Sequence, residues 1–72
     1  MFVILHGDNV FCGYRPSGYL IWDKFSYENT TVRPNIFLSE VEAVAEGNSI
    51  QTNFHVGVLV IPIEKWIEDN KK

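Results

Sequence analysis

The amino-acid sequence predicts an α+β domain, in which an antiparallel sheet of about four strands carries one amphipathic helix on a face and a short C-terminal helix. Three observations lead to this fold class: short β-type runs separated by glycine-containing turns, a helix-start motif at Ser39, and a strongly apolar, β-branched run over residues 55–63. The chain has 72 residues, which is the size of one small domain, so we expect residues 1–72 to form a single domain.

The first part of the chain has the pattern of a β-meander. Residues 2–6, 10–15 and 19–23 are short extended-type runs. The sequences Gly-Asp-Asn at 7–9 and Pro-Ser-Gly at 16–18 have the chemistry of tight turns and separate these runs. Because such turns join neighbouring antiparallel strands, we expect three consecutive strands to lie side by side.

A less regular stretch follows the meander. Residues 24–31 are polar and lack a clear period, which predicts a loop. Residues 31–38 would extend as another short strand. Pro34 lacks the N–H group that a strand ladder needs, so such a strand would be broken there or would lie at an edge of the sheet.

One amphipathic helix is predicted to begin at Ser39. The sequence Ser-Glu-Val-Glu over residues 39–42 is a capping box, and Leu38 before it is placed to act as a hydrophobic staple on Ala43. An apolar stripe at helical spacing follows, and we expect it to face inward; its members are Val41, Val44 and Ala45.

The end of this helix is ambiguous in the sequence. Gly47-Asn48 is a typical C-terminal stop, which predicts an end near Glu46 or Gly47. A second apolar series at helical spacing would carry the helix on to about residue 53; its members are Ala43, Gly47, Ile50 and Phe54. The longer helix therefore stands as the alternative to the early stop.

Residues 55–63 are the most apolar and most β-branched run in the chain. Apolar side chains would occupy both faces of an extended segment here, which predicts a strand buried on both sides at the centre of the sheet. After Pro62, the residues Ile63, Trp66 and Ile67 fall on one helical face. They predict a short terminal helix that packs Trp66 against the sheet.

The net charge is −3, and the charged residues are unevenly distributed. Residues 34–64 contain no Lys or Arg, although they include Glu40, Glu42, Glu46 and Glu64. Binding of nucleic-acid phosphates needs clustered basic residues, so we expect no direct nucleic-acid binding. The opening residues lack the features of a secretory signal, and the longest apolar run is too short to span a bilayer. We therefore expect a cytoplasmic protein with no membrane partner.

Few residues have the chemistry of a metal site or a catalytic site. His6, Cys12 and His55 are the only soft metal ligands, and they lie far apart in the sequence, so a small metal-binding enzyme that uses them is the minor alternative. Cys12 is the only cysteine and cannot form an intramolecular disulfide; its neighbours favour a buried, unreactive thiol. No phosphate-binding glycine motif is present, and we expect neither a cofactor nor catalysis.

Two sets of residues have the composition of partner-binding surfaces. The acidic set would meet a basic partner or, as an alternative, imitate DNA; it consists of Glu40, Glu42 and Glu46. The aromatic set surrounds the second turn and resembles interface anchors; it consists of Tyr14, Tyr19, Trp22 and Tyr27. The chain has more aromatic residues than so small a core should enclose, which favours a homodimer that covers the aromatic set.

Residues 33–43, Arg-Pro-Asn-Ile-Phe-Leu-Ser-Glu-Val-Glu-Ala, and residues 58–63, Val-Leu-Val-Ile-Pro-Ile, together resemble small phage and prophage accessory proteins. Those proteins carry an aromatic–Ser–x–x–Glu–Ala helix start after a meander and end in a similar apolar strand. The interruption at Gly47-Asn48 departs from the longer helix that is usual there. The resemblance implies an accessory factor that binds and inhibits a host or defence protein in the bacterial cytoplasm, and it carries over no functional residues. We therefore expect a non-enzymatic protein-binding module.

Overall fold

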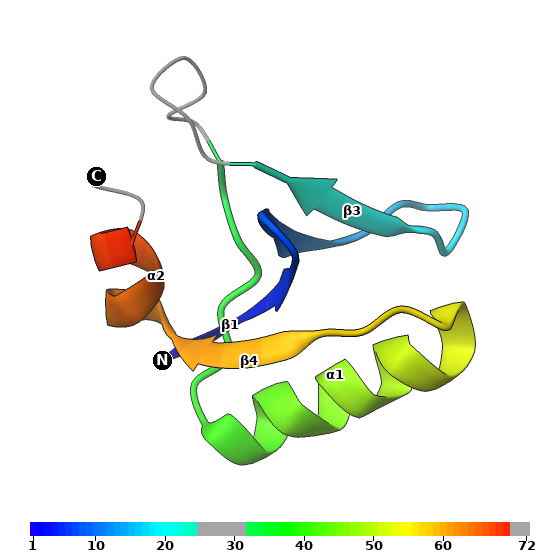
Figure 1. The fold of residues 1–72 in the computed structure, drawn as a ribbon. Coiled ribbons are helices and arrows are strands. Elements are labelled where there is room, and N and C mark those ends of the chain that lie inside the picture. The colour runs from blue at the N-terminus through cyan, green and yellow to red at the C-terminus, as the bar shows by residue number, and fades with distance from the viewer. Residues whose placement is uncertain (25–31, 70–72) are drawn as a thin grey trace.

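The described residues fold as a four-stranded antiparallel sheet with two helices, which confirms the predicted α+β class (Figure 1). A computed structural model describes residues 1–24 and 32–69. The predicted loop therefore lies, apart from its first residue, outside the described residues. In chain order the elements are β1 (Phe2–His6), β2 (Asn9–Tyr14), β3 (Leu20–Asp23), α1 (Glu40–Phe54), β4 (Leu59–Pro62) and α2 (Ile63–Asp69).

The first three strands form the predicted antiparallel meander. β1 pairs with β2 through Leu5 and Val10, and β2 pairs with β3 through Phe11 and Trp22. The register of β2 against β3 shifts between Phe11 and Gly13, where Gly13 has a φ of 115°, a conformation that glycine adopts without strain. This β-bulge increases the local twist of the ribbon that ends in the turn between β2 and β3.

β4 lies at an edge of the sheet, so the prediction of a central strand is wrong. The strand order is β3-β2-β1-β4, and β4 pairs with β1, where Ile4 lies opposite Val60. The strand is shorter than the predicted run and is incompletely buried: Ile61 is buried, Val60 on the opposite face is partly buried, and Leu59 is 60% exposed. The apolar composition identifies a strand correctly but does not report which strands lie beside it.

Alternate strand residues form two hydrophobic clusters, one on each face of the sheet. The cluster beneath α1 is centred on three fully buried side chains: Ile4, Phe11 and Ile50. The cluster on the other face is centred on three further buried side chains: Val3, Val10 and Ile61. Trp66 of α2 packs against this second cluster, as predicted. Successive side chains of a strand point to opposite faces, so β1 and β2 each contribute to both clusters.

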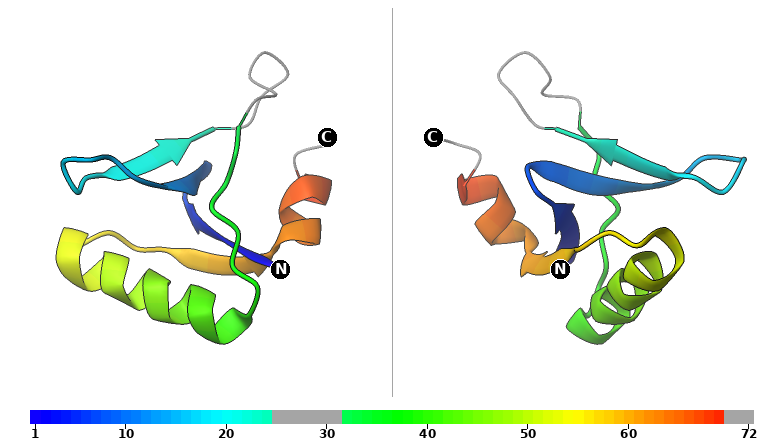
Figure 2. Two further views of the ribbon diagram at one scale, coloured as in Figure 1. Left: turned by 180° about the vertical axis from the view of Figure 1, so that it is seen from behind. Right: turned by 45° about the vertical axis from the view of Figure 1, so that its right-hand side comes forward.

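Within residues 32–39, the described segment that precedes α1, one isolated β-bridge takes the place of the predicted strand. Phe37 and Phe2 exchange two backbone hydrogen bonds of 2.8 and 2.9 Å, and the Asn35 N–H donates to the Phe11 carbonyl at 2.8 Å. Figure 2 shows residues 32–39 running past β1 to the start of α1. These bonds tie the segment to both β1 and β2 and so fix where α1 begins.

α1 begins where the capping box predicts. Ser39 is the N-cap, and its hydroxyl oxygen accepts a hydrogen bond from the backbone N–H of Glu42 at 3.2 Å. The predicted staple between Leu38 and Ala43 is wrong, because Leu38 is 78% exposed while Ala43 is fully buried. The start of the helix therefore depends on the cap, and Leu38 is left on the surface.

α1 continues through Gly47 to Phe54, so the predicted early end is wrong. A Cβ atom at Gly47 would meet Val58 Cγ2 at 3.2 Å. The lack of a side chain at Gly47 therefore eases the close approach of the helix to the segment that leads into β4, and this glycine does not terminate the helix. The helix ends at His55, which has a left-handed φ of 57° and donates its N–H to the Gln51 carbonyl at 3.0 Å.

Candidate functional site

α1 is oriented about its axis in the opposite way to the prediction. The helix buries Ala43, Gly47 and Ile50 of the second apolar series against the sheet. The stripe that the sequence predicts to face inward is exposed instead; it consists of Val41, Val44 and Ala45. Val41 is 79% exposed and Val44 is 41% exposed. The helix thus has apolar residues on two faces, and the sheet covers one of them.

We define the outer face of α1 by the exposed residues Val41, Val44, Ala45 and Asn48. Together with Glu40, these residues line an open groove of about 460 Å³ on the helix surface. Leu38, which directly precedes the N-cap, adds a further exposed apolar side chain. Single apolar residues on a surface are ordinary, but a group at helical spacing is characteristic of an interaction surface.

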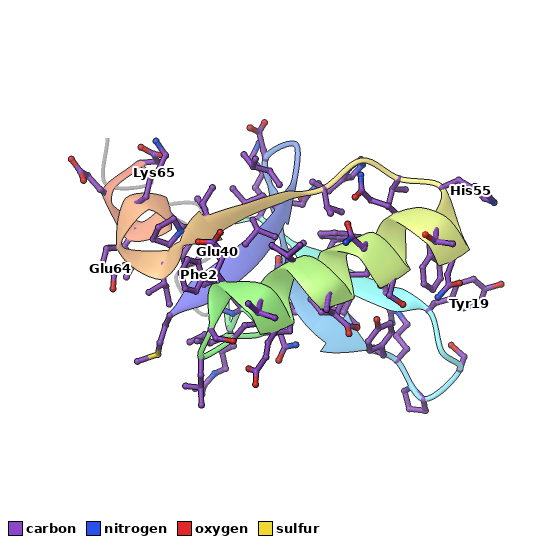
Figure 3. All side chains as sticks on the ribbon, turned by 90° about the horizontal axis from the view of Figure 1, so that it is seen from below. Phe2, Tyr19, Glu40, His55, Glu64 and Lys65 are labelled. Carbon is purple, nitrogen blue, oxygen red and sulfur yellow. The ribbon has the colours of Figure 1, made fainter. Side chains whose placement is uncertain are left out.

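Carboxylates border the outer face on both sides. With 3.6 residues per turn, Glu40 falls on one border of the face and Glu42 falls on the other. Both side chains are exposed, and α1 contains no Lys or Arg that would neutralise them. Figure 3 shows Glu40 at the end of the molecule that also holds Phe2. The outer face is therefore an apolar stripe between two acidic borders.

Glu46 lies nearer to the sheet and contacts the aromatic set. The Tyr14 hydroxyl, at the end of β2, donates a hydrogen bond to Glu46 Oε1. Partial burial, together with the hydrogen bond to Glu46 and its negative charge, raises the pKa of Tyr14 to about 12, so the hydroxyl keeps its proton at neutral pH. Tyr14 also packs edge-on against Phe11, with ring centroids 5.3 Å apart. The hydrogen bond between Tyr14 and Glu46 links α1 to the β2–β3 ribbon.

The described members of the aromatic set lie in different surroundings. Trp22 is partly buried, and its ring centroid lies 5.8 Å from that of Phe11 and 5.5 Å from that of His6. Tyr19 is 68% exposed and lies at the end of the molecule opposite α2 (Figure 3). Tyr27 lies outside the described residues. Trp22 therefore belongs mainly to the core, and the homodimer that this set favours stays a prediction.

His6, Cys12 and His55 have separate structural roles. His6 Nδ1 donates to the Gly57 carbonyl oxygen at 2.7 Å, and His55 ends α1. Cys12 packs against the cluster on the other face of the sheet; its burial, with a smaller contribution from the charge of Asp23, raises the pKa of its thiol and so leaves little reactive thiolate. Within the part of the chain that the structure describes, no three His, Cys, Asp or Glu side chains form a group that could hold a metal ion.

The sequence contains one signal that points to the outer face. Two apolar series share the same helix at helical spacing, and a helix that packs on one sheet can bury only one of them. The presence of two such series therefore indicates that one of them stays exposed. In the structure the second series is buried, and the stripe of Val41, Val44 and Ala45 is on the surface. The acidic residues Glu40 and Glu42 are predicted correctly as surface residues.

Neither helix of the described residues has the length and hydropathy that crossing a membrane would require. No family model matches the chain, and searches of curated proteins and of solved structures find no match. The candidate function therefore follows from the surface of the described residues, on which the outer face of α1 groups several exposed apolar side chains.

Proposed function

We propose that this protein is a non-enzymatic protein-binding module that covers part of a partner protein with the outer face of α1. One observation carries the proposal: α1 has apolar residues on two faces, and only one of these faces packs against the sheet. A helix on the surface of a globular domain ordinarily presents polar residues to solvent. An apolar outer face is what a binding surface needs before its partner arrives.

The exposed apolar side chains are sufficient to anchor a small interface. Leu38 and Val41 are each more than three-quarters exposed, and Val44 is about two-fifths exposed. Full burial of an aliphatic side chain contributes roughly 1.5–3 kcal/mol. Covering the three side chains would thus contribute several kcal/mol, from which the loss of translational and rotational freedom is subtracted. This balance favours a reversible interaction.

The action that we propose is steric inhibition. The outer face presents apolar and carboxylate groups, which can dock a protein and orient a basic rim. The resemblance of residues 33–43 and 58–63 to phage accessory proteins supports a partner that is a host or defence protein in the bacterial cytoplasm. The start of α1, with Ser39 and Glu42, lies in the first of these stretches.

The acidic DNA mimic is the less well supported candidate. A mimic presents carboxylates where phosphates would lie, whereas apolar side chains occupy the middle of this face and Glu46 is bonded to Tyr14. A mimic would lose affinity steeply as ionic strength rises, because screening removes most of its attraction. Apolar docking would retain most of its affinity in the same titration.

Site-specific photo-crosslinking tests the proposal. Val41 is replaced by p-benzoylphenylalanine, and the same replacement at Ile67 of α2, another exposed apolar residue, is the control. After irradiation in a bacterial cell extract, we expect a discrete protein adduct from position 41 and none from position 67. Unlabelled protein should compete the adduct away, and its Val41→Ser variant should compete poorly. Equal adducts from both positions, or none from position 41, would contradict the proposal.

A further inference from the structure

The outer face of α1 has the shape of a groove between two ridges of side chains. One ridge consists of Glu40, Val44 and Asn48, and the other consists of Val41 and Ala45; within each ridge the residues are four positions apart. The ridge of a second helix packs into a groove of this kind, with the helix axes about 8–10 Å apart and crossing at roughly −50°. A second helix can therefore pack on this surface by the ordinary geometry of helix pairs.

α1 offers a partner its side chains and not its backbone. Residues 40–54 form a continuous helix, in which interior N–H and C=O groups bond to one another. A partner strand that docks by backbone pairing needs an open strand edge, which a helix face does not provide. The contact must therefore be made by side chains of the partner, and an amphipathic helix presents them at the matching spacing.

The negative charge around the groove favours a partner with positive charge. Glu40 lines the groove and Glu42 borders its other side, and α1 contains no Lys or Arg. If a second copy of this chain docked through the same face, carboxylates would meet carboxylates with no cation from either helix. A different protein with basic residues beside its apolar row would pair with both borders.

We infer that the outer face of α1 binds an amphipathic α-helix of another protein, whose apolar row fills the groove and whose Lys or Arg residues flank that row. This inference rests on the proposed protein-binding function and names the class of partner. Ala45 has the smallest side chain on the face, so the partner helix approaches most closely there. Val41 and Val44 supply the apolar walls on the two sides of the groove.

Two synthetic peptides of identical Leu, Lys and Ala composition test this partner class. In one peptide, leucines recur at i, i+3, i+4 and i+7 with lysines beside them; in the other, the order is permuted so that no apolar face forms. Titration of isotope-labelled protein, followed by NMR, measures the affinity and maps the site. We expect the amphipathic peptide to bind at least about tenfold more tightly and to shift the amide signals of residues 40–48.

A matched pair of apolar variants connects this binding to the outer face. Val41→Ser removes a side chain that is 79% exposed, and Ser and Val have similar helix propensities, so the fold should be unaffected. We expect this variant to bind the amphipathic peptide about tenfold more weakly, since one aliphatic contact is lost. Ile67→Ser removes an exposed apolar side chain from α2 and should leave the affinity unchanged.

A matched pair of charge variants tests the acidic borders. E40Q/E42Q neutralises both borders while keeping a glutamine at the third helical position, where it can still serve the capping box. We expect this variant to bind roughly three- to tenfold more weakly and with less dependence on salt. E64Q/E68Q removes the same charge from α2 and should bind as the original protein does.

Several outcomes would overturn the inference. The inference would be overturned if the two peptides bound with equal affinity. It would also be overturned if both members of a matched pair lost the same affinity, or if the peptide shifted amide signals only outside α1. Self-association in sedimentation equilibrium that Val41→Ser abolishes would also do so, because a second copy would then be the occupant. A protein adduct from position 41 combined with failed peptide binding would refute the basic helical partner and leave the proposed function standing. Specific peptide binding without an adduct from position 41 would instead refute the proposed function, because no protein in the extract would then bind the outer face.

Discussion

Replacing Gly47 tests how closely α1 packs against the segment that leads into β4. A Cβ atom at Gly47 would lie 3.2 Å from Val58 Cγ2 and 3.6 Å from Val60 Cγ2. Alanine in a helix interior is about 1 kcal/mol more favourable than glycine, whereas overpacking costs about 1–3 kcal/mol. Relief of the closer contact needs a shift of only a few tenths of an ångström, and Val58 precedes the regular strand. We therefore expect Gly47→Ala to leave the free energy of unfolding within about 1 kcal/mol of its original value.

Gly47→Val should be far more damaging than Gly47→Ala. It adds two further methyl groups where the first carbon is already in tight contact, so the helix must move away from the sheet. We expect the free energy of unfolding to fall by about 3 kcal/mol. That is a large part of the roughly 4–11 kcal/mol typical of a domain of this length. Denaturant titration followed by far-UV circular dichroism measures both variants.

Asn48→Ala is the matched control for the Gly47 series. Asn48 is exposed, so alanine should add about 0.5 kcal/mol through helix propensity without any steric contact. If Gly47→Val unfolded at the same denaturant concentration as the original protein, the close approach to Val58 would be refuted. If Gly47→Ala were destabilising by about 2 kcal/mol or more while Asn48→Ala had no destabilising effect, the expected tolerance of alanine beside Val58 would be refuted.

Substitutions at three further residues have defined consequences. Ser39→Ala removes the N-cap bond to Glu42 and should lower the free energy of unfolding by about 1 kcal/mol in denaturant titration, while Ser39→Asp should be tolerated. Ile50→Ala empties a fully buried position between α1 and the sheet and should lower the free energy of unfolding by about 2–5 kcal/mol; an unchanged unfolding midpoint would disprove that packing. Tyr14→Phe should alter the alkaline pH dependence, because the pKa of Tyr14 is about 12 in the folded protein and lies above its unfolded value. The stabilisation from Tyr14 is thus complete below about pH 10 and is lost as the pH rises towards 12. The difference between the unfolding midpoints of the two proteins should shrink over that range, and a constant difference would count against the Glu46 hydrogen bond.

Features that depend on neighbouring residues are predicted well from the sequence. The three strands of the meander follow from apolar runs at 2–6, 10–15 and 19–23, and short turns leave antiparallel pairing as the simple outcome. The N-cap at Ser39 depends on an N–H group only three residues away. Such contacts are set by local geometry, so the rest of the fold has little influence on them.

Features that depend on distant residues are predicted poorly. Two apolar series on α1 have the same spacing, and the choice between them depends on which one fits the sheet. Gly47 favours burial of the second series, because its lack of a side chain lets the helix lie close to Val58. No local pattern distinguishes a glycine needed for close packing from one that ends a helix. The edge position of β4 is likewise a property of strand order, which the apolar composition of the strand does not encode.

The candidate site was predictable in part. The acidic character of α1 and the exposure of Glu40 and Glu42 follow from their charge. The bond between Tyr14 and Glu46 joins residues 32 positions apart, so it appears only when the helix lies on the ribbon. The outer face is missed because apolar residues at helical spacing most often belong to a core.

The pairing of β1 with β4 sets the order in which the chain can fold. Ile4 lies opposite Val60, so the loop that this pairing closes contains β2, β3 and α1. The meander closes only short turns, whereas the long loop loses more chain entropy before its contacts compensate. α1 packs on both β1 and β4, so its docking platform is complete only after the long loop closes. Substitutions at Ile4 should therefore slow folding, whereas substitutions in α2 should mainly accelerate unfolding.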